Sequence, residues 1–137
     1  MGVVPVVDEG TAVLLVRQYR SSVEMSLLEI PAGLRDVAGE PPIETARREL
    51  IEEVGMRAGR VERLCSFHNS PGFCDEVVHV FAAFDLTPCG LDRQGIEEQH
   101  MTIERVALDD VAGMIASGAL TDAKTVIGLL LVRDLLS

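Results

Sequence analysis

The sequence has no apolar run long enough to cross a membrane, although 47% of its residues are hydrophobic. Its N-terminus also lacks the basic stretch followed by an apolar stretch that is typical of a secretory leader. The three cysteines are odd in number and show no C-x-x-C spacing, which favours reduced thiols over a disulfide framework. These absences predict a cytoplasmic protein with no membrane partner.

Basic residues are also scarce. Lys and Arg together number 12 against 22 Asp and Glu, which gives a formal net charge of −10. Because a general nucleic-acid-binding surface is normally basic, we expect no nucleic-acid partner. The length suits one domain with a buried core, so we expect residues 1–137 to form a single domain.

What the chain does contain is a dense acidic segment over residues 48–53. On a helix, Glu49 lies three positions from Glu52 and four from Glu53, so the three carboxylates crowd one strip. Magnesium and manganese ions prefer carboxylate oxygens as ligands. Taken alone, the strip fits either a metal site or a solvated acidic helix face.

The surroundings of the strip favour a site. A short apolar run over residues 27–30 breaks at residues 31–33, where proline and glycine end a strand. We expect a helix from about Pro42 to Val54, because proline is tolerated in a first helical turn and Gly55 can end the helix. A strand, a glycine-bearing loop and a helix with clustered carboxylates together predict a site for metal and phosphate.

The rest of the chain reads as strands and helices without repeats or linkers. Pro5 favours an edge position for the first strand, since proline cannot donate to a strand ladder. The pattern predicts a mixed sheet with helices packed on it. We expect strands over residues 3–7, 11–19, 27–30, 61–67, 76–85 and 101–106, a loop over 86–94, a helix over 108–118, and a last helix that follows a cap at Thr121 or Asp122.

The segment from Glu40 resembles the Nudix signature, Gly-x5-Glu-x7-Arg-Glu-U-x-Glu-Glu-x-Gly-U, in which U is a bulky aliphatic residue. Seven residues follow Glu40, and Arg48 to Met56 then match every fixed position. One departure is that six residues, not five, separate Gly33 from Glu40, in an expected loop where insertions cost little. The resemblance implies an α/β Nudix fold, with a mixed β-sheet sandwiched between α-helices.

The resemblance also implies an enzyme that hydrolyses a nucleoside diphosphate linked to another group, with Mg²⁺ or Mn²⁺ as cofactor. It places metal ligation on Glu49 and Glu53, with Glu52 in support and as a further catalytic candidate. The backbone carbonyl of Ala32 is a further candidate ligand by resemblance. Bound cations would explain how so acidic a protein accepts a diphosphate.

Four other charged residues have roles implied by the resemblance. Arg48 is expected to pair with a glutamate and orient it, and Glu40 to support the start of the helix, where negative charge is favoured. Glu97 and Glu98 lie in an acidic stretch where the family carries a mobile catalytic glutamate, so either could be the general base. Counting back from the strand start at Met101 slightly favours Glu97, and a solvated loop is the alternative for both.

A second cluster resembles the ADP-ribose pyrophosphatase branch of the family. Residues 70–76 contain a Pro-Gly-x-x-Asp-Glu pattern that begins fifteen positions after Met56, and residues 17–20 and 29–33 resemble segments of that branch. An ordinary turn, surface arginines and packed aromatic rings are the alternatives. The candidate substrate-binding residues are Arg17, Tyr19, Arg20, Pro71, Gly72, Phe73 and Glu76.

The expected reaction is hydrolysis of ADP-ribose, or a similar nucleoside diphosphate sugar, to AMP and ribose 5-phosphate. Two alternatives stay open: action on other nucleoside diphosphate derivatives, and a Nudix-like domain that only senses such a ligand. The intact set of Glu49, Glu52 and Glu53 argues against a sensor, which need not keep metal ligands. Relatives of the branch that this sequence resembles usually carry an extra N-terminal β segment, which contributes to dimer formation and to the adenine site, whereas this chain starts almost directly on the catalytic domain. A truncated form and a branch that forms its homodimer differently both stay open.

Overall fold

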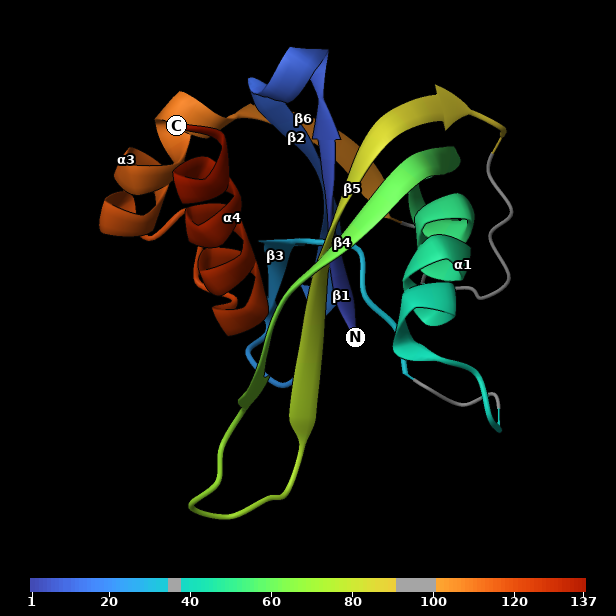
Figure 1. Cartoon of the computed structure of the whole chain (residues 1–137). Coiled ribbons are helices and arrows are strands. Elements are labelled where there is room, and N and C mark those ends of the chain that lie inside the picture. The colour runs from blue at the N-terminus through green and yellow to red at the C-terminus, as the bar shows by residue number, and fades with distance from the viewer. Residues whose placement is uncertain (35–37, 91–100) are drawn as a thin grey trace.

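The computed structural model describes residues 1–34, 38–90 and 101–137. It shows a twisted sheet with α1 on one face and α3 and α4 on the other (Figure 1). Among the helices in these ranges, none is both long and apolar enough to cross a membrane. The elements are β1 (Gly2–Val7), η1 (Asp8–Gly10), β2 (Ala12–Arg20), β3 (Met25–Glu29), α1 (Pro42–Val54), β4 (Met56–His68), β5 (Val77–Pro88), β6 (Thr102–Ala107), η2 (Leu108–Asp110), α3 (Val111–Ser117) and α4 (Ala123–Leu136).

The sheet is mixed, as the sequence predicts. The strand order is β3-β2-β1-β5-β4, and β6 pairs with β2 outside this path. Strands β1 and β5 run parallel, whereas the pairs β1–β2, β2–β3, β2–β6 and β4–β5 are antiparallel. The expected α/β architecture, a mixed sheet between helices, is confirmed.

The first strand is not at the edge of the sheet, so this prediction from Pro5 is wrong. Strand β1 lies between β2 and β5 and is almost entirely buried. N–H groups two residues apart point to the same side of a strand. Val3 and Pro5 therefore face the same neighbour, on the side of β1 away from β5. On that side the N–H of Val3 donates to the carbonyl of Pro31, and the pairing with β2 begins only at Val6. Pro5 therefore falls in a gap between two partners, where no N–H is needed.

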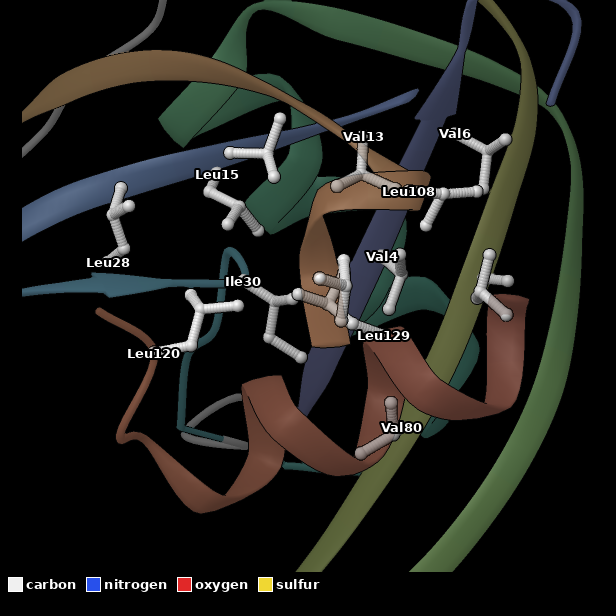
Figure 2. Packing of buried hydrophobic residues seen from close by; sticks show 14 of the residues in the cluster. Val4, Val6, Val13, Leu15, Leu28, Ile30, Val80, Leu108, Leu120 and Leu129 are labelled. Carbon is white, nitrogen blue, oxygen red and sulfur yellow. The ribbon is translucent and has the colours of Figure 1, made fainter. Parts of the chain in front are cut away.

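Two hydrophobic clusters hold the helices against opposite faces of the sheet. Val3 and Leu50 belong to the cluster under α1, whereas Val4 and Leu129 belong to the cluster under α3 and α4. Figure 2 shows the second cluster, in which Val4, Val80 and Leu129 converge between β1, β5 and α4. Adjacent residues of β1 thus serve both cores, because successive side chains of a strand point to opposite faces.

The predicted helices fit the structure better than the predicted strand ends. Helix α1 spans Pro42–Val54 as expected, and Gly55 ends it with a φ of 67°, a left-handed conformation that glycine adopts without strain. Helix α4 begins after Asp122, whose side chain accepts from the N–H of Thr125. By contrast, β4 starts at Met56 instead of residue 61, and β5 runs into the predicted loop as far as Pro88.

Candidate active site

A cavity of about 610 Å³ lies where β1 begins, between α1 and the N-terminal end of α4. This volume is within the usual range for small-molecule sites, roughly 300–1,000 Å³. Four parts of the fold contribute polar lining residues. They are Glu49 and Glu53 from α1, Gln18 and Arg20 from β2, Asn69 and Glu76 from the two ends of the loop between β4 and β5, and Asp122 and Lys124 from the start of α4.

The α1 side of the cavity is acidic. Glu49 and Glu53 are only 6% and 4% exposed. The N–H of Ala32 donates to Oε2 of Glu53 at 3.0 Å. A Cβ atom on Gly33 would lie 2.1 Å from Oε1 of Glu49, so only glycine lets the backbone pass so close to this carboxylate. The segment at Ala32 and Gly33 therefore crosses directly over both carboxylates.

Backbone bonds to β1 fix this crossing segment. The carbonyl of Pro31 accepts from Val3 at 3.0 Å, and the N–H of Gly33 donates to the carbonyl of Met1 at 3.1 Å. Ala32 also forms an isolated bridge with Gly2. The short stretch after β3 is thus held as an extra strand-like segment beside β1, which places its backbone against α1.

Arg48 organises the outer side of the same helix, as the sequence predicts. Its guanidinium lies 3.1 Å from Glu40, 3.2 Å from Glu49 and 3.6 Å from Glu52. The hydrogen bond to Glu40 and the neighbouring carboxylate charges raise the pKa of Arg48 above its ordinary value. Glu40 also accepts from the hydroxyl of Thr45 at 2.6 Å, so it contacts the first turn of α1, and its structural role there stays a prediction.

Glu52 stands apart from the other two glutamates of the strip. It lines a different cavity, on the outer face of α1, together with Glu40 and Arg48. The lining residues described for the main cavity include Glu49 and Glu53 but not Glu52. Its supporting and catalytic roles stay predictions, and its ion pair with Arg48 favours an indirect effect on Glu49.

The α1 side fits a divalent cation. Two buried carboxylates on successive turns of a helix offer the hard oxygen ligands that Mg²⁺ and Mn²⁺ prefer, and burying such charges is costly unless they are compensated. Within the described ranges, no group of three or more His, Cys, Asp or Glu side chains is arranged to hold a metal ion. A cation here would therefore draw on Glu49, Glu53 and backbone oxygens, of which the Ala32 carbonyl is one candidate.

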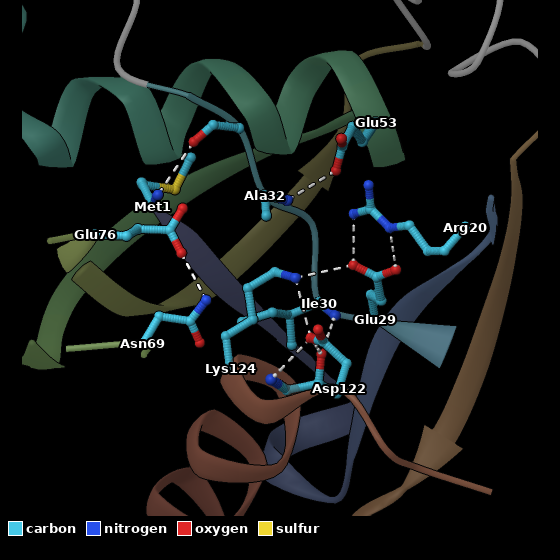
Figure 3. A network of polar contacts seen from close by, with 12 residues as sticks. Met1, Arg20, Glu29, Ile30, Ala32, Glu53, Asn69, Glu76, Asp122 and Lys124 are labelled. Atoms are coloured by element: carbon cyan, nitrogen blue, oxygen red, sulfur yellow. Dashed lines mark hydrogen bonds and ion pairs between the residues drawn. The ribbon is translucent and has the colours of Figure 1, made fainter. Parts of the chain in front are cut away.

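On the α4 side, a buried carboxylate holds two cations. Glu29 is 1% exposed, and its two oxygens accept from Nε and Nη2 of Arg20, each at 2.7 Å. The ammonium of Lys124 donates to the same carboxylate at 2.9 Å (Figure 3). Burial alone would raise the pKa of Glu29, but the hydrogen bonds from Arg20 and the charge of Lys124 outweigh it and lower that pKa below its ordinary value.

Asp122 connects this group to the helix. Its Oδ2 accepts from Lys124 at 3.0 Å and from the backbone and hydroxyl of Thr125 at 3.2 and 2.7 Å. The hydroxyl of Thr125 in turn accepts from the N–H of Ile30 at 2.9 Å. The first turn of α4 is therefore tied to the residue that directly follows β3, two positions before Ala32 in the segment that crosses the acidic side.

The candidate residues on β2 divide between the two faces of the sheet. Arg20 lines the cavity with Gln18, whereas Arg17 pairs with Glu104 at 2.6 Å and Tyr19 is 61% exposed. This split follows from strand geometry, because residues at odd and even positions point to opposite faces. Among the described residues of the lining, Arg17 and Tyr19 do not occur, and their substrate-binding roles stay predictions.

The candidates after β4 are also divided. Glu76 lines the cavity and accepts from the side chain of Asn69 at 2.7 Å. Phe73 is 87% exposed at the tip of the β4–β5 hairpin, and neither it nor Pro71 and Gly72 belongs to the lining that the structure describes. Their roles therefore stay predictions, as do those of Glu97 and Glu98, which lie outside the described residues.

Sequence reasoning missed Gln18, Asn69 and Lys124 of the cavity lining, and Glu29, which lies behind the lining. Gln18 and Arg20 could have been grouped by their period of two. Lys124 could have been noticed as the only lysine in the chain. Nothing in the sequence places Lys124 against Glu29, because 95 positions separate the two residues.

The family model that describes the NUDIX domain matches residues 1–127 of the sequence. The chain belongs to the Nudix family. This Nudix domain is 39% identical over 91% of its length to an ADP-ribose pyrophosphatase of Bacillus subtilis (strain 168), and 38% identical over 92% to one of Mycobacterium tuberculosis (strain ATCC 25618 / H37Rv). It spans less than two thirds of both relatives, 66% and 61% of their lengths.

A solved structure also resembles this Nudix domain. The crystal structure of an ADP compounds hydrolase superposes with a TM-score of 0.86 at 31% identity, and the match covers 98% of this chain and 70% of that one. The similarity extends far beyond the signature helix, so the family and fold predicted from the sequence are confirmed for nearly the whole chain.

Proposed function

We propose that this Nudix domain hydrolyses the diphosphate bond of ADP-ribose, or of a similar nucleoside diphosphate sugar, to AMP and ribose 5-phosphate. The observation that carries the proposal is the burial of Glu49 and Glu53, both from the Nudix signature, side by side in the wall of a cavity of about 610 Å³. The names of the two ADP-ribose pyrophosphatases and of the ADP compounds hydrolase support this substrate class.

The charge of the cavity supports a role for a divalent cation, with magnesium as the first candidate. Among the described lining residues, four side chains are acidic and two are basic, which gives these side chains a formal charge of −2 that would repel a diphosphate. Glu49 and Glu53, with the Ala32 carbonyl, would hold the cation. When bound, it would offset phosphate charge and activate water. The chain itself fixes both carboxylates, through Arg48 behind Glu49 and the Ala32 N–H on Glu53.

The reaction needs a group that takes a proton from water. As the water oxygen bonds to one phosphorus atom, the P–O bond to the bridging oxygen breaks and the second phosphate leaves with the bonding electron pair. A positioned carboxylate can accept the proton that the water loses. We assign this role to Glu97 or Glu98, with Glu52 as the next candidate.

A substrate panel tests the proposal. ADP-ribose, UDP-glucose, a diadenosine polyphosphate and 8-oxo-dGTP are compared by kcat/KM at one magnesium concentration and with the metal chelated, and products are identified by mass. We expect ADP-ribose to be preferred, to yield AMP and ribose 5-phosphate, and to require the metal. Preference for 8-oxo-dGTP would overturn the substrate class, and tight ADP-ribose binding without turnover would favour a ligand sensor.

A further inference from the structure

Lys124 is the single lysine of this chain, whose other eleven basic residues are arginines. It lies in the first turn of α4 and lines the cavity that contains Glu49 and Glu53. The Nudix signature does not include it, and the reaction proposed above does not use it. Its place in the cavity therefore needs its own explanation.

The carboxylates around Lys124 hold its ammonium in a fixed position. Nζ lies 2.9 Å from Oε1 of Glu29 and 3.0 Å from Oδ2 of Asp122. The same Oε1 atom accepts from Nη2 of Arg20 at 2.7 Å. One oxygen of a buried carboxylate thus brings two cationic groups together in the cavity wall, although like charges at this spacing repel.

The side chains of Arg20 and Lys124 are more exposed than the carboxylate of Glu29 that lies between them. The side chain of Glu29 is 2% exposed, whereas those of Arg20 and Lys124 are 38% and 17% exposed. An ammonium has three N–H donors, and two of those of Lys124 have acceptors among the described residues. A donor therefore remains for a ligand in the cavity.

We propose that Lys124 binds a phosphate group of the diphosphate substrate, from the side of the cavity opposite the metal-binding carboxylates. This inference rests on the proposed function, since it names the residue that would recognise the second phosphate. A diphosphate carries charge on both phosphorus centres, and a cation at Glu49 and Glu53 meets it from one side only. A compact ammonium held by two carboxylates supplies a directed point charge on the other side.

The test compares Lys124→Gln with the unsubstituted protein by calorimetric titration with inorganic pyrophosphate at fixed magnesium. Because a hydrogen bond to a charged group contributes roughly 1.5–3 kcal/mol, we expect the Kd for pyrophosphate to rise about tenfold or more. KM for ADP-ribose should rise with it. Arg105→Gln is the matched control, since it removes one positive charge from an exposed ion pair with Asp8 outside the cavity.

Two readouts separate phosphate binding from a structural role. Thermal unfolding shows whether Lys124→Gln is folded, and Mn²⁺ titration shows whether its acidic side is intact. The inference requires weakened pyrophosphate binding with Mn²⁺ binding changed less than about twofold. It is overturned if both ligands weaken in parallel, if pyrophosphate binds Lys124→Gln as it binds the unsubstituted protein, or if the unsubstituted protein binds no pyrophosphate.

A measurement on the unsubstituted protein keeps the test valid if Lys124→Gln does not fold. Lys124 carries the only side-chain amine, so its acetylation by acetic anhydride can be followed by mass spectrometry of one peptide. Pyrophosphate should slow this acetylation severalfold without slowing that of free Nα-acetyl-lysine in the same tube. An unchanged rate at saturating pyrophosphate would contradict the inference. None of these binding measurements needs turnover, so they stand or fall separately from the proposed hydrolysis.

Discussion

The α1 side of the cavity presents the carboxylates of Glu49 and Glu53, whereas the α4 side presents the cations of Arg20 and Lys124 beside the carboxylate of Asp122. Each side also has a group of opposite charge behind it. On the α1 side, Arg48 lies 3.2 Å behind Glu49. On the α4 side, the buried carboxylate of Glu29 lies behind Arg20 and Lys124. A complex of a divalent cation with a diphosphate has a positive and a negative part, so a cavity with these two sides is suited to hold both.

The two sides also differ in how far apart their residues lie in the sequence. Glu49 and Glu53 are one helical turn apart in a signature that can be read directly, whereas Glu29 and Lys124 are 95 positions apart and meet only in the folded chain. A function carried by one helix can be inferred from spacing alone. The recognition of the substrate by the second side, as proposed above, depends on tertiary structure.

The largest expected effect concerns the general base. Replacing the general base should lower kcat by roughly 10²–10⁴-fold, because no other group would be placed to take the proton. We expect this loss in Glu97→Gln or Glu98→Gln, but not in both, when kcat for ADP-ribose is measured at saturating magnesium. Full activity in both variants would move the base to Glu52.

On the acidic side, Glu53→Gln should lower kcat/KM at limiting magnesium by about 10²–10³-fold, since it removes a ligand charge with little change in volume. The amide oxygen can still accept from Ala32, so the fold should persist. Steady-state kinetics across a magnesium series measure the loss. Glu44→Gln, on an exposed position of the same helix, is the control; near-normal turnover of Glu53→Gln would refute the ligand assignment.

The crossing segment can be tested through Gly33→Ala. The added Cβ would lie 2.1 Å from the Glu49 carboxylate, so either this side chain or the backbone must move. A displacement on the order of 1 Å near reacting groups costs roughly 10²-fold in rate, and we expect a loss of that size in kcat/KM. Gly113→Ala has nothing within 4 Å of its new Cβ and should keep its activity. Equal activity of the two variants would show that the close approach is not required.

The smallest effect concerns the stability of the basic side. At pH 7, Glu29→Gln should lower the free energy of unfolding by about 1–3 kcal/mol, because Arg20 and Lys124 lose a charged acceptor. The pKa of Glu29 is lowered in the folded protein, so its stabilisation is present above the unfolded pKa of about 4.3 and is lost as pH falls below it. Urea unfolding at pH 7 and pH 3.5 should show the difference from the unsubstituted protein narrowing in acid. A difference that is the same at both pH values would contradict the assigned charge of Glu29.

Much of the fold could be predicted because its signals are local. The proline at the start of α1, its apolar stripe and the glycine at residue 55 define a helix that the structure reproduces. Strand β1 shows the limit of such signals. A proline indicates an edge strand only where an inner strand would need the N–H donor that proline lacks, and at Pro5 no neighbouring strand needs it. The gap beside Pro5 arises from the path of residues 31–33, which no local pattern specifies.

Only the part of the candidate site that lies within one helix could be predicted, because its residues are close together in the sequence. Glu49 and Glu53 line the cavity as expected, whereas Glu52 faces Arg48 on the outer side of α1. Arg20 was found by resemblance, but its partner Glu29 and the neighbouring Lys124 were not. Their grouping depends on α4 reaching the end of β3, a contact between distant parts of the chain that sequence spacing cannot show.

The most direct test of the division between the two sides is a Mn²⁺ titration of three proteins by calorimetry without nucleotide: the unsubstituted chain, Glu53→Gln and Lys124→Gln. Removing one carboxylate ligand should weaken Mn²⁺ binding by about tenfold or more, whereas Lys124→Gln should change it less than about twofold. A Glu53→Gln variant that binds Mn²⁺ as tightly as the unsubstituted protein, or a Lys124→Gln variant that loses as much as Glu53→Gln, would contradict the account.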